Sequence, residues 1–146
     1  MTGVQTCALP ISLRRFQQRE EIFDVCRKRW VALTPEEWVR QQVLLQLTNV
    51  LQVPESWIAV EKEIEVNQLR KRFDILVYDD QGKACCLIEC KASDVPLSAA
   101  VFDQLMRYQL QVQVPYLIIT NGGTTRGWFR VNNTLQELSD WPPFGK

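Results

Sequence analysis

The sequence predicts an α/β fold whose mixed sheet combines an antiparallel meander with a parallel strand that is reached through a helical crossover. Three strand-like runs follow one another across short turns, at residues 57–66, 72–78 and 83–92. A helical segment follows at about residues 97–111, and an almost wholly apolar run then covers residues 115–120. Such a run is typical of the buried centre of a sheet, and a parallel strand requires a long connection of this kind.

A first helix is expected to begin after Thr34, whose hydroxyl can cap it. Pro35 suits the first helical position, and Glu36 and Glu37 lie near the positive end of the helix dipole. We expect the helix to reach about Leu51, with a buried stripe made by Val39, Val43, Leu47 and Val50. By helical angle Glu36 falls on this stripe and Glu37 falls near its edge. Glu36 is therefore the acid expected to point inward, with Glu37 as its substitute.

Turn residues separate the remaining elements. Residues 67–68 and 79–82 divide the three strands of the meander, and residues 93–96 introduce the second helix. Residues 121–123 end the apolar strand, after which residues 127–131 are expected to form a short edge strand. The tail at residues 141–144 is expected to be irregular.

The first residues are set apart from the fold. Residues 2–11 resemble the translation of a sequencing adapter, so we expect residues 1–12 to be non-native and residues 13–146 to form a single domain. A secretory signal peptide is a weaker interpretation, because no basic residue precedes the short apolar stretch.

Composition limits the possible functions. Seventeen basic and seventeen acidic residues give a net charge of zero, so DNA contacts must be local or come from a protein partner. No apolar run approaches the roughly 20 residues that span a bilayer, so we expect no membrane association. Without histidine or a CxxC pair, the cysteines at 26, 85, 86 and 90 are expected to be free in a reducing cytoplasm. A metal-thiolate or redox role for Cys85, Cys86 and Cys90 is a remote alternative.

An Asp-Glu-Lys constellation is predicted on the second and third strands. Side chains two apart in a strand share a face, so Glu89 and Lys91 lie on one side, about 7 Å apart. With a two-residue loop at residues 81–82, Asp74 lies opposite Glu89, whereas a four-residue loop places it opposite Leu87 on the same face. Only an uncompensated odd-length loop would separate these side chains.

These residue types point to metal-assisted phosphodiester hydrolysis. Two converging carboxylates repel one another unless a cation lies between them, and Mg²⁺ suits carboxylate ligands, with Mn²⁺ as a substitute. Asp74 and Glu89 are the expected ligands, together with the backbone carbonyl of Cys90. Lys91 would orient or help to deprotonate the attacking water and stabilise charge on the phosphate.

The same residues resemble a known signature. Asp74 followed by Glu89-Cys90-Lys91 is similar to the D…(D/E)xK pattern of restriction-endonuclease-like (PD-(D/E)xK) nucleases. Residues 33–41, 72–78 and 120–122 resemble the N-terminal domain of the type I restriction enzyme R subunit, particularly its small standalone versions. The resemblance covers about residues 22–141.

This resemblance implies an α/β/α sandwich around a mixed sheet, Mg²⁺-dependent DNA cleavage, and a role in DNA restriction or repair. It also supplies a role for an acid on the first helix, here Glu36. The motor domains of the full R subunit are absent from the sequence, so no ATP-driven translocation is expected.

A second resemblance concerns nucleic-acid contacts. Gln104 and Tyr108 are similar to the Gln-x-x-x-Tyr accessory motif of RecB-like nucleases and share one helical face. Arg107 and Tyr108 are candidates for contact with the phosphate backbone, and Gln104 for positioning a strand. Arg72, in a run of three basic residues, is a candidate for gripping phosphate. Solvated faces are the alternative interpretation of both groups.

Two functions remain open at this point. The complete set of Asp74, Glu89 and Lys91 favours an active nuclease. The neutral net charge and the missing motor domains favour a catalytically silent module on the same fold that binds nucleic acid or assembles with a partner. The oligomeric state stays open.

Overall fold

The structure is a computed structural model that describes residues 11–66, 68–109 and 112–144. For residues 66, 69, 108 and 109 the description covers the backbone alone. A six-stranded sheet forms its centre, with the strand order β4-β5-β6-β7-β8-β9. These strands are β4 (Ile58–Val66), β5 (Leu69–Tyr78), β6 (Ala84–Cys90), β7 (Tyr116–Thr120), β8 (Thr125–Val131) and β9 (Thr134–Glu137).

The sheet is mixed, as the sequence predicts. β4, β5 and β6 form an antiparallel meander, and β7 runs parallel to β6. Helix α2 (Ala99–Gln109) lies in the connection between these two parallel strands. β8 and β9 continue the sheet in antiparallel fashion, and β9 was not predicted. Residues 141–144 form neither helix nor strand, which confirms the expected irregular tail.

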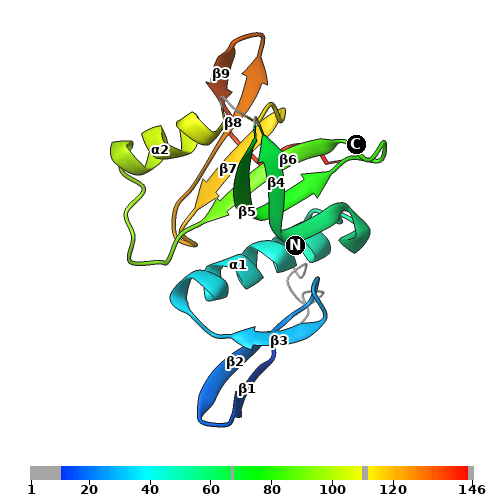
Figure 1. The fold of residues 1–146 in the computed structure, drawn as a ribbon, viewed down its shortest axis with the longest axis vertical. Helices are drawn as coiled ribbons and strands as arrows, with labels where there is room; N and C mark the ends of the chain where they lie inside the picture. The colour runs from blue at the N-terminus through cyan, green and yellow to red at the C-terminus, as the bar shows by residue number, and fades with distance from the viewer. Residues whose placement is uncertain (1–10, 67, 110–111, 145–146) are drawn as a thin grey trace, which may run out of the picture.

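One helix packs against each face of this sheet (Figure 1). Val39, Val43 and Leu44 of helix α1 (Pro35–Leu45) contact apolar side chains of β5, β6 and β7. On the opposite face, Leu105 of α2 packs among Leu87 and other apolar residues of the same strands. The central strands are therefore covered on both sides, which explains their nearly continuous apolar sequences. Within the described residues, no helix is long and apolar enough to cross a membrane.

The first helix begins as predicted but ends differently. The Thr34 hydroxyl accepts a hydrogen bond from the Glu37 amide at 3.0 Å. After α1, the turn Gln46–Val50 is a π-helix, which holds more residues per turn than an α-helix. This wider turn rotates the residues that follow. Val50 is consequently 48% exposed, so its predicted place in the buried stripe was wrong, and Leu44 is buried instead.

A separate three-stranded sheet precedes α1 and was not predicted. Its strands are β1 (Leu13–Phe16), β2 (Arg19–Asp24) and β3 (Arg29–Ala32), paired in that order and antiparallel. Ile22 and Asp24 are fully buried, and Gln41 of α1 donates a hydrogen bond to Asp24 Oδ2 at 2.9 Å. In Figure 1 the helix α1 lies between the two sheets.

Candidate active site

The pairing of β5 with β6 brings Asp74 alongside Glu89. Ile75 pairs with Ile88, so the next residues outward on the two strands are Asp74 and Glu89. This register is the one expected from a two-residue loop, although the connection actually spans residues 79–83. Val77 pairs with Cys86 and Tyr78 with Ala84, so a bulge at Cys85 near the start of β6 compensates for the odd length of that connection. The two acids therefore meet through a turn that the sequence analysis did not anticipate.

Asp74 is held by two hydrogen bonds from different elements. Its Oδ2 accepts from the Cys90 amide of β6 at 2.7 Å, and its Oδ1 accepts from Arg40 Nη2 of α1 at 3.1 Å. The side chain is only 15% exposed. Beyond the pair of Ile75 with Ile88, the amide of Cys90 therefore donates to a side-chain carboxylate of β5 and not to a backbone carbonyl of that strand.

Glu89 is electrostatically coupled to Asp74. Burial raises the pKa of Glu89 well above its usual value, and the charge of Asp74 and a side-chain hydrogen bond between the two residues raise it further. Lys91 acts in the opposite direction. A positive charge that approached this pair would favour the ionised form of Glu89.

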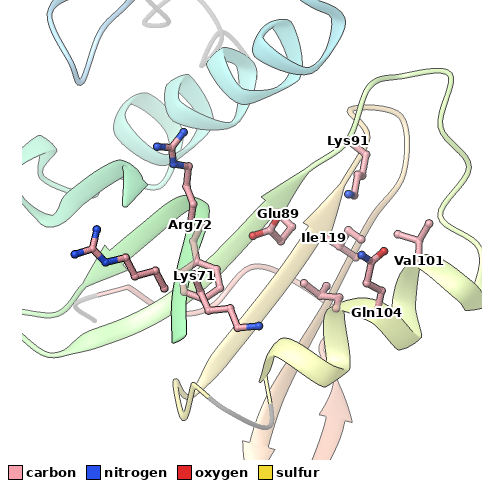
Figure 2. A pocket seen from close by; sticks show the side chains of 10 residues that line it. Lys71, Arg72, Glu89, Lys91, Val101, Gln104 and Ile119 are labelled. Atoms are coloured by element: carbon pink, nitrogen blue, oxygen red, sulfur yellow. The ribbon is translucent and has the colours of Figure 1, made fainter. Parts of the chain in front are cut away.

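A cleft of about 310 Å³ opens beside Glu89 on the face that carries α2. Figure 2 shows Glu89 of β6 between Arg72 of β5 and Lys91, with Gln104 of α2 on the far side. Arg70 and Lys71 complete its basic rim. The structure therefore gathers four of the predicted site residues around one cavity.

The other predicted nucleic-acid residues stand apart from this cavity or fall outside the description. Arg107 is exposed in the last turn of α2 and is not among the residues that line the cleft. The side chain of Tyr108 lies outside the described residues, so the Gln-x-x-x-Tyr motif can be placed only through Gln104.

Arg40 is a central residue that the sequence analysis missed. Its side chain is 6% exposed, and its Nη1 lies 3.0 Å from Glu37 Oε1 and 3.3 Å from Glu61 Oε1. Its Nη2 contacts Asp74 and lies 3.8 Å from Glu36 Oε1. One guanidinium therefore joins α1 to β4 and β5. An arginine three and four residues after two helical acids was the available signal.

The two acids of α1 occupy different environments. Glu36 was expected to be the buried acid, but the structure buries Glu37 and leaves Glu36 half-exposed. Glu37 is buried, where it accepts hydrogen bonds from Arg27 and Arg40 at 3.0 Å and from Gln41 at 3.0 Å. The helical-angle argument placed Glu36 inward because it did not include the N-terminal sheet, whose β2–β3 connection carries Arg27 over Glu37.

Glu36 nevertheless lies near the candidate site. Its side chain is 48% exposed. Partial burial raises the pKa of its carboxyl, and the charge of Asp74 raises it further, whereas Arg40 and Lys91 lower it. Its catalytic role stays a prediction.

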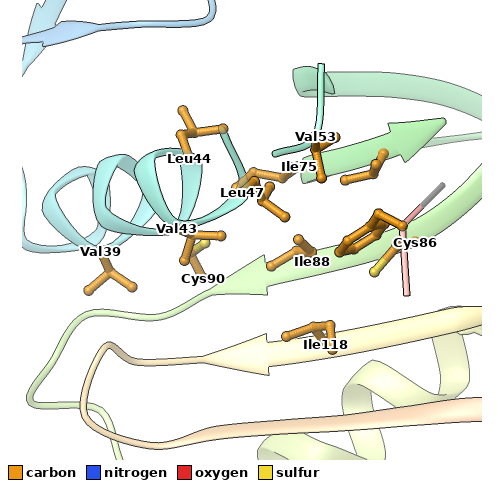
Figure 3. Close-up of a cluster of buried hydrophobic side chains, with 12 residues drawn as sticks. Val39, Val43, Leu44, Leu47, Val53, Ile75, Cys86, Ile88, Cys90 and Ile118 are labelled. Carbon is orange, nitrogen blue, oxygen red and sulfur yellow. The ribbon is translucent and has the colours of Figure 1, made fainter. Parts of the chain in front are cut away.

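The four cysteines of the described residues are not part of a group that could hold a metal ion. Within the described residues all four are free, and Cys86 and Cys90 are buried. Figure 3 shows Cys90 beside Val43 in the apolar layer under α1. Burial raises the pKa of both thiols well above the usual range, so neither is a reactive thiolate.

Comparison with known proteins gives one match. The model of the family described as "Type I restriction enzyme R protein N terminus (HSDR_N)" matches residues 35–142. Searches of curated proteins and of solved structures found no match. The matched region begins with α1 and includes the six-stranded sheet with Asp74, Glu89 and Lys91. The chain therefore belongs to the family of type I restriction enzyme R protein N-terminal domains.

Proposed function

We propose that this chain is a metal-dependent deoxyribonuclease domain that hydrolyses phosphodiester bonds in a restriction-related role. The observation that carries the proposal is the pair of Asp74 and Glu89, coupled to one another and adjacent to Lys91. Family membership supports the restriction context.

The chemistry of the donor set fits Mg²⁺. Within the part of the chain that the structure describes, no group of three or more acidic or cysteine side chains is placed so that together they could hold a metal ion. Mg²⁺ does not need such a group, because it commonly binds through one or two carboxylates and keeps water or phosphate oxygens as its other ligands. Asp74 and Glu89 would hold the ion, with the Cys90 carbonyl as a further ligand, and Mn²⁺ would substitute. When bound, the ion supplies Lewis-acid chemistry and lowers the pKa of a coordinated water.

Lys91 supplies the positive charge that the reaction needs beside the acids. It lines the same cleft as Glu89 and interacts electrostatically with both Glu89 and Glu36. An ammonium group in this position can orient the attacking water and stabilise the negative charge that develops on the phosphate.

The rim of the cleft suits a nucleic-acid backbone. Arg70, Lys71 and Arg72 line it from β5, and Gln104 lines it from α2. Basic side chains contribute phosphate contacts that position DNA without reading its sequence. We therefore infer that the scissile strand lies between β5 and α2, with Glu89 below it.

One observation favours the second candidate, a catalytically silent module. Oδ1 of Asp74 already accepts a hydrogen bond from the positively charged guanidinium of the buried Arg40. If that contact persists when DNA and metal are present, Asp74 has less capacity to bind a cation.

A cleavage assay distinguishes the two candidates. Single-stranded, double-stranded and flapped DNA are each incubated with the chain in Mg²⁺, in Mn²⁺ or in chelator. An active nuclease cleaves at least one substrate with either ion and none in chelator. DNA binding without cleavage under every metal condition would instead support the silent module.

A further inference from the structure

The N-terminal three-stranded sheet has a charge that the rest of the chain does not share. Residues 13–32 contain six basic and three acidic residues, which gives +3, although the whole chain has a net charge of zero. The remaining residues therefore carry −3. The family match begins at residue 35, so this basic sheet lies outside the matched region.

The outer face of this sheet combines arginine with aromatic side chains. Strand pairing aligns Arg14 with Glu21, Phe16 with Arg19, and Phe23 with Trp30, and alternation places all six on one face. The opposite face carries the buried Ile22 and Asp24 against α1. The arginine-aromatic face is thus opposite to the face on which Asp24 contacts α1.

Arg14 organises this face. Its guanidinium carbon lies 4.7 Å from the ring centroid of Phe16 and 4.4 Å from that of Trp30. Its Nε donates to Glu21 Oε1 at 2.8 Å, and Arg19 pairs with the other oxygen of Glu21. These contacts fix two guanidinium groups and two rings relative to one another.

The face also leads toward the candidate active site. A groove of about 700 Å³ is lined by Arg19, Arg29 and Trp30 of the sheet. The same groove is lined by Glu36, Arg40 and Ala92, the residue after Lys91. A chain that binds the sheet can therefore continue along this groove to Glu36, which lies near the candidate site.

We propose that β1–β3 and the adjoining groove bind single-stranded DNA, with bases stacked on Phe16 and Trp30 and phosphates on Arg19 and on Arg29, which lines the groove beside Trp30. Basic grooves with interleaved aromatic rings are the usual means of binding single strands without sequence preference, because every base presents a π-face. Phe16 is 49% exposed, a high value for a phenylalanine in a strand. The choice of DNA as the ligand rests on the proposed nuclease function, but binding itself does not require cleavage.

Fluorescence anisotropy in chelator tests this proposal without interference from cleavage. The probe is a labelled oligothymidylate of about 20 nucleotides, longer than the span that one small domain commonly covers. The variants are Phe16→Ala and Arg29→Ala. The matched control is Lys83→Ala, which removes an exposed charge from the turn before β6. Thermal melting of each variant establishes that it is folded.

We expect Phe16→Ala to weaken binding by at least about fivefold with an unchanged salt dependence, since it removes stacking and no charge. Arg29→Ala should weaken binding and reduce the slope of log K against log salt by about 0.7, the value for one phosphate contact on a single strand. Lys83→Ala should bind as the unaltered chain does.

The outcomes separate this inference from the proposed nuclease. Binding that Phe16→Ala and Arg29→Ala leave unchanged would overturn the sheet as a DNA surface, even if the chain cleaves DNA. A labelled duplex of the same length, measured in parallel, that binds more tightly than the single strand and is insensitive to Phe16→Ala would overturn it as well. Binding that depends on both residues, with no cleavage of single-stranded, double-stranded or flapped DNA in Mg²⁺ or Mn²⁺, would support the inference and contradict the nuclease.

Discussion

Arg40 Nη2 lies 3.1 Å from Asp74 Oδ1, so a buried helical arginine holds the candidate catalytic aspartate of β5. The same guanidinium contacts Glu37 and Glu61, and Glu61 in turn lies 3.1 Å from Arg27 Nη1. This network connects the N-terminal sheet, α1, β4 and β5. The position of Asp74 therefore depends on the packing of elements that are distant from it in the sequence.

Replacing Arg40 should destabilise the fold strongly. Arg40→Ala leaves Glu37, Glu61 and Asp74 without a shared buried counter-charge. Removing one partner of a buried ion pair lowers the free energy of unfolding by about 3–5 kcal/mol. Arg126→Ala is the matched control, because its pair with Glu137 is exposed and should contribute no more than about 1 kcal/mol. Urea denaturation measures both free energies of unfolding. Equal effects of the two substitutions would show that the network does not stabilise the fold.

Stability should fall in acid because of Asp24. Burial acts to raise the pKa of Asp24, but hydrogen bonds from Arg27 and Gln41 outweigh it, so the pKa lies below its ordinary value. The folded state therefore binds this proton less readily than the unfolded state. The resulting stability is present above about pH 4, near the pKa of an unperturbed aspartate, and is lost as the pH falls through the lower folded value.

Asp24→Asn should accordingly lower the melting temperature at pH 7. The further fall in melting temperature between pH 5 and strongly acid conditions, roughly the range over which such a group titrates, should be smaller in this variant than in the unaltered chain. Asp80→Asn, in the exposed β5–β6 turn, serves as the control. Melting curves across this pH range that coincide for Asp24→Asn and the unaltered chain would contradict the assignment.

Glu36 and Glu37 should separate stability from activity. Glu37→Gln weakens buried contacts with Arg27 and Arg40, so it should lower the melting temperature. Glu36→Gln affects a half-exposed side chain near Asp74 and Lys91, so it should reduce cleavage with little loss of stability. Parallel melting and cleavage measurements test this. A stable Glu37→Gln together with an unstable Glu36→Gln would reverse the roles that the structure indicates.

The central sheet was predictable because each of its signals is local. Apolar runs and turn residues located β4 to β7, and the period of two placed Glu89 and Lys91 on one face. The pairing of Ile75 with Ile88 could not be chosen from the sequence alone, because it depends on a bulge at Cys85 of β6 that compensates for the odd-length turn.

The N-terminal sheet was not predictable because its signals are weak. Gln17 and Gln18 form the β1–β2 turn with φ of 51° and 65°, a conformation for which glycine or asparagine is the usual marker. Clustered charges also interrupt the apolar alternation of β2. Because this sheet was not predicted, the contact between Arg27 and Glu37 could not be predicted either. The helical angle alone therefore selected Glu36 as the buried acid in place of Glu37.

Replacement of either site carboxylate should abolish metal binding and cleavage together. Asp74→Ala or Glu89→Ala leaves one carboxylate, which would hold Mg²⁺ poorly. Calorimetric titration with Mg²⁺ and a plasmid-nicking assay measure the two properties on the same protein. Asp103→Ala, on the exposed surface of α2, is the control. Full binding and cleavage in both site variants would exclude these residues as ligands.

Lys91→Ala should separate metal binding from catalysis, because Lys91 provides a charge beside the acids and no ligand oxygen. Removing this charge lowers the repulsion of an incoming cation, so the affinity for Mg²⁺ should persist or increase. Cleavage should fall by about 10² or more, the usual effect of losing a proton-transfer or electrostatic group. The same titration and nicking assay decide the matter, with Lys83→Ala as the charge-matched control. Cleavage that continues at the full rate in Lys91→Ala, or in chelator, would contradict the mechanism centred on Asp74, Glu89 and Lys91.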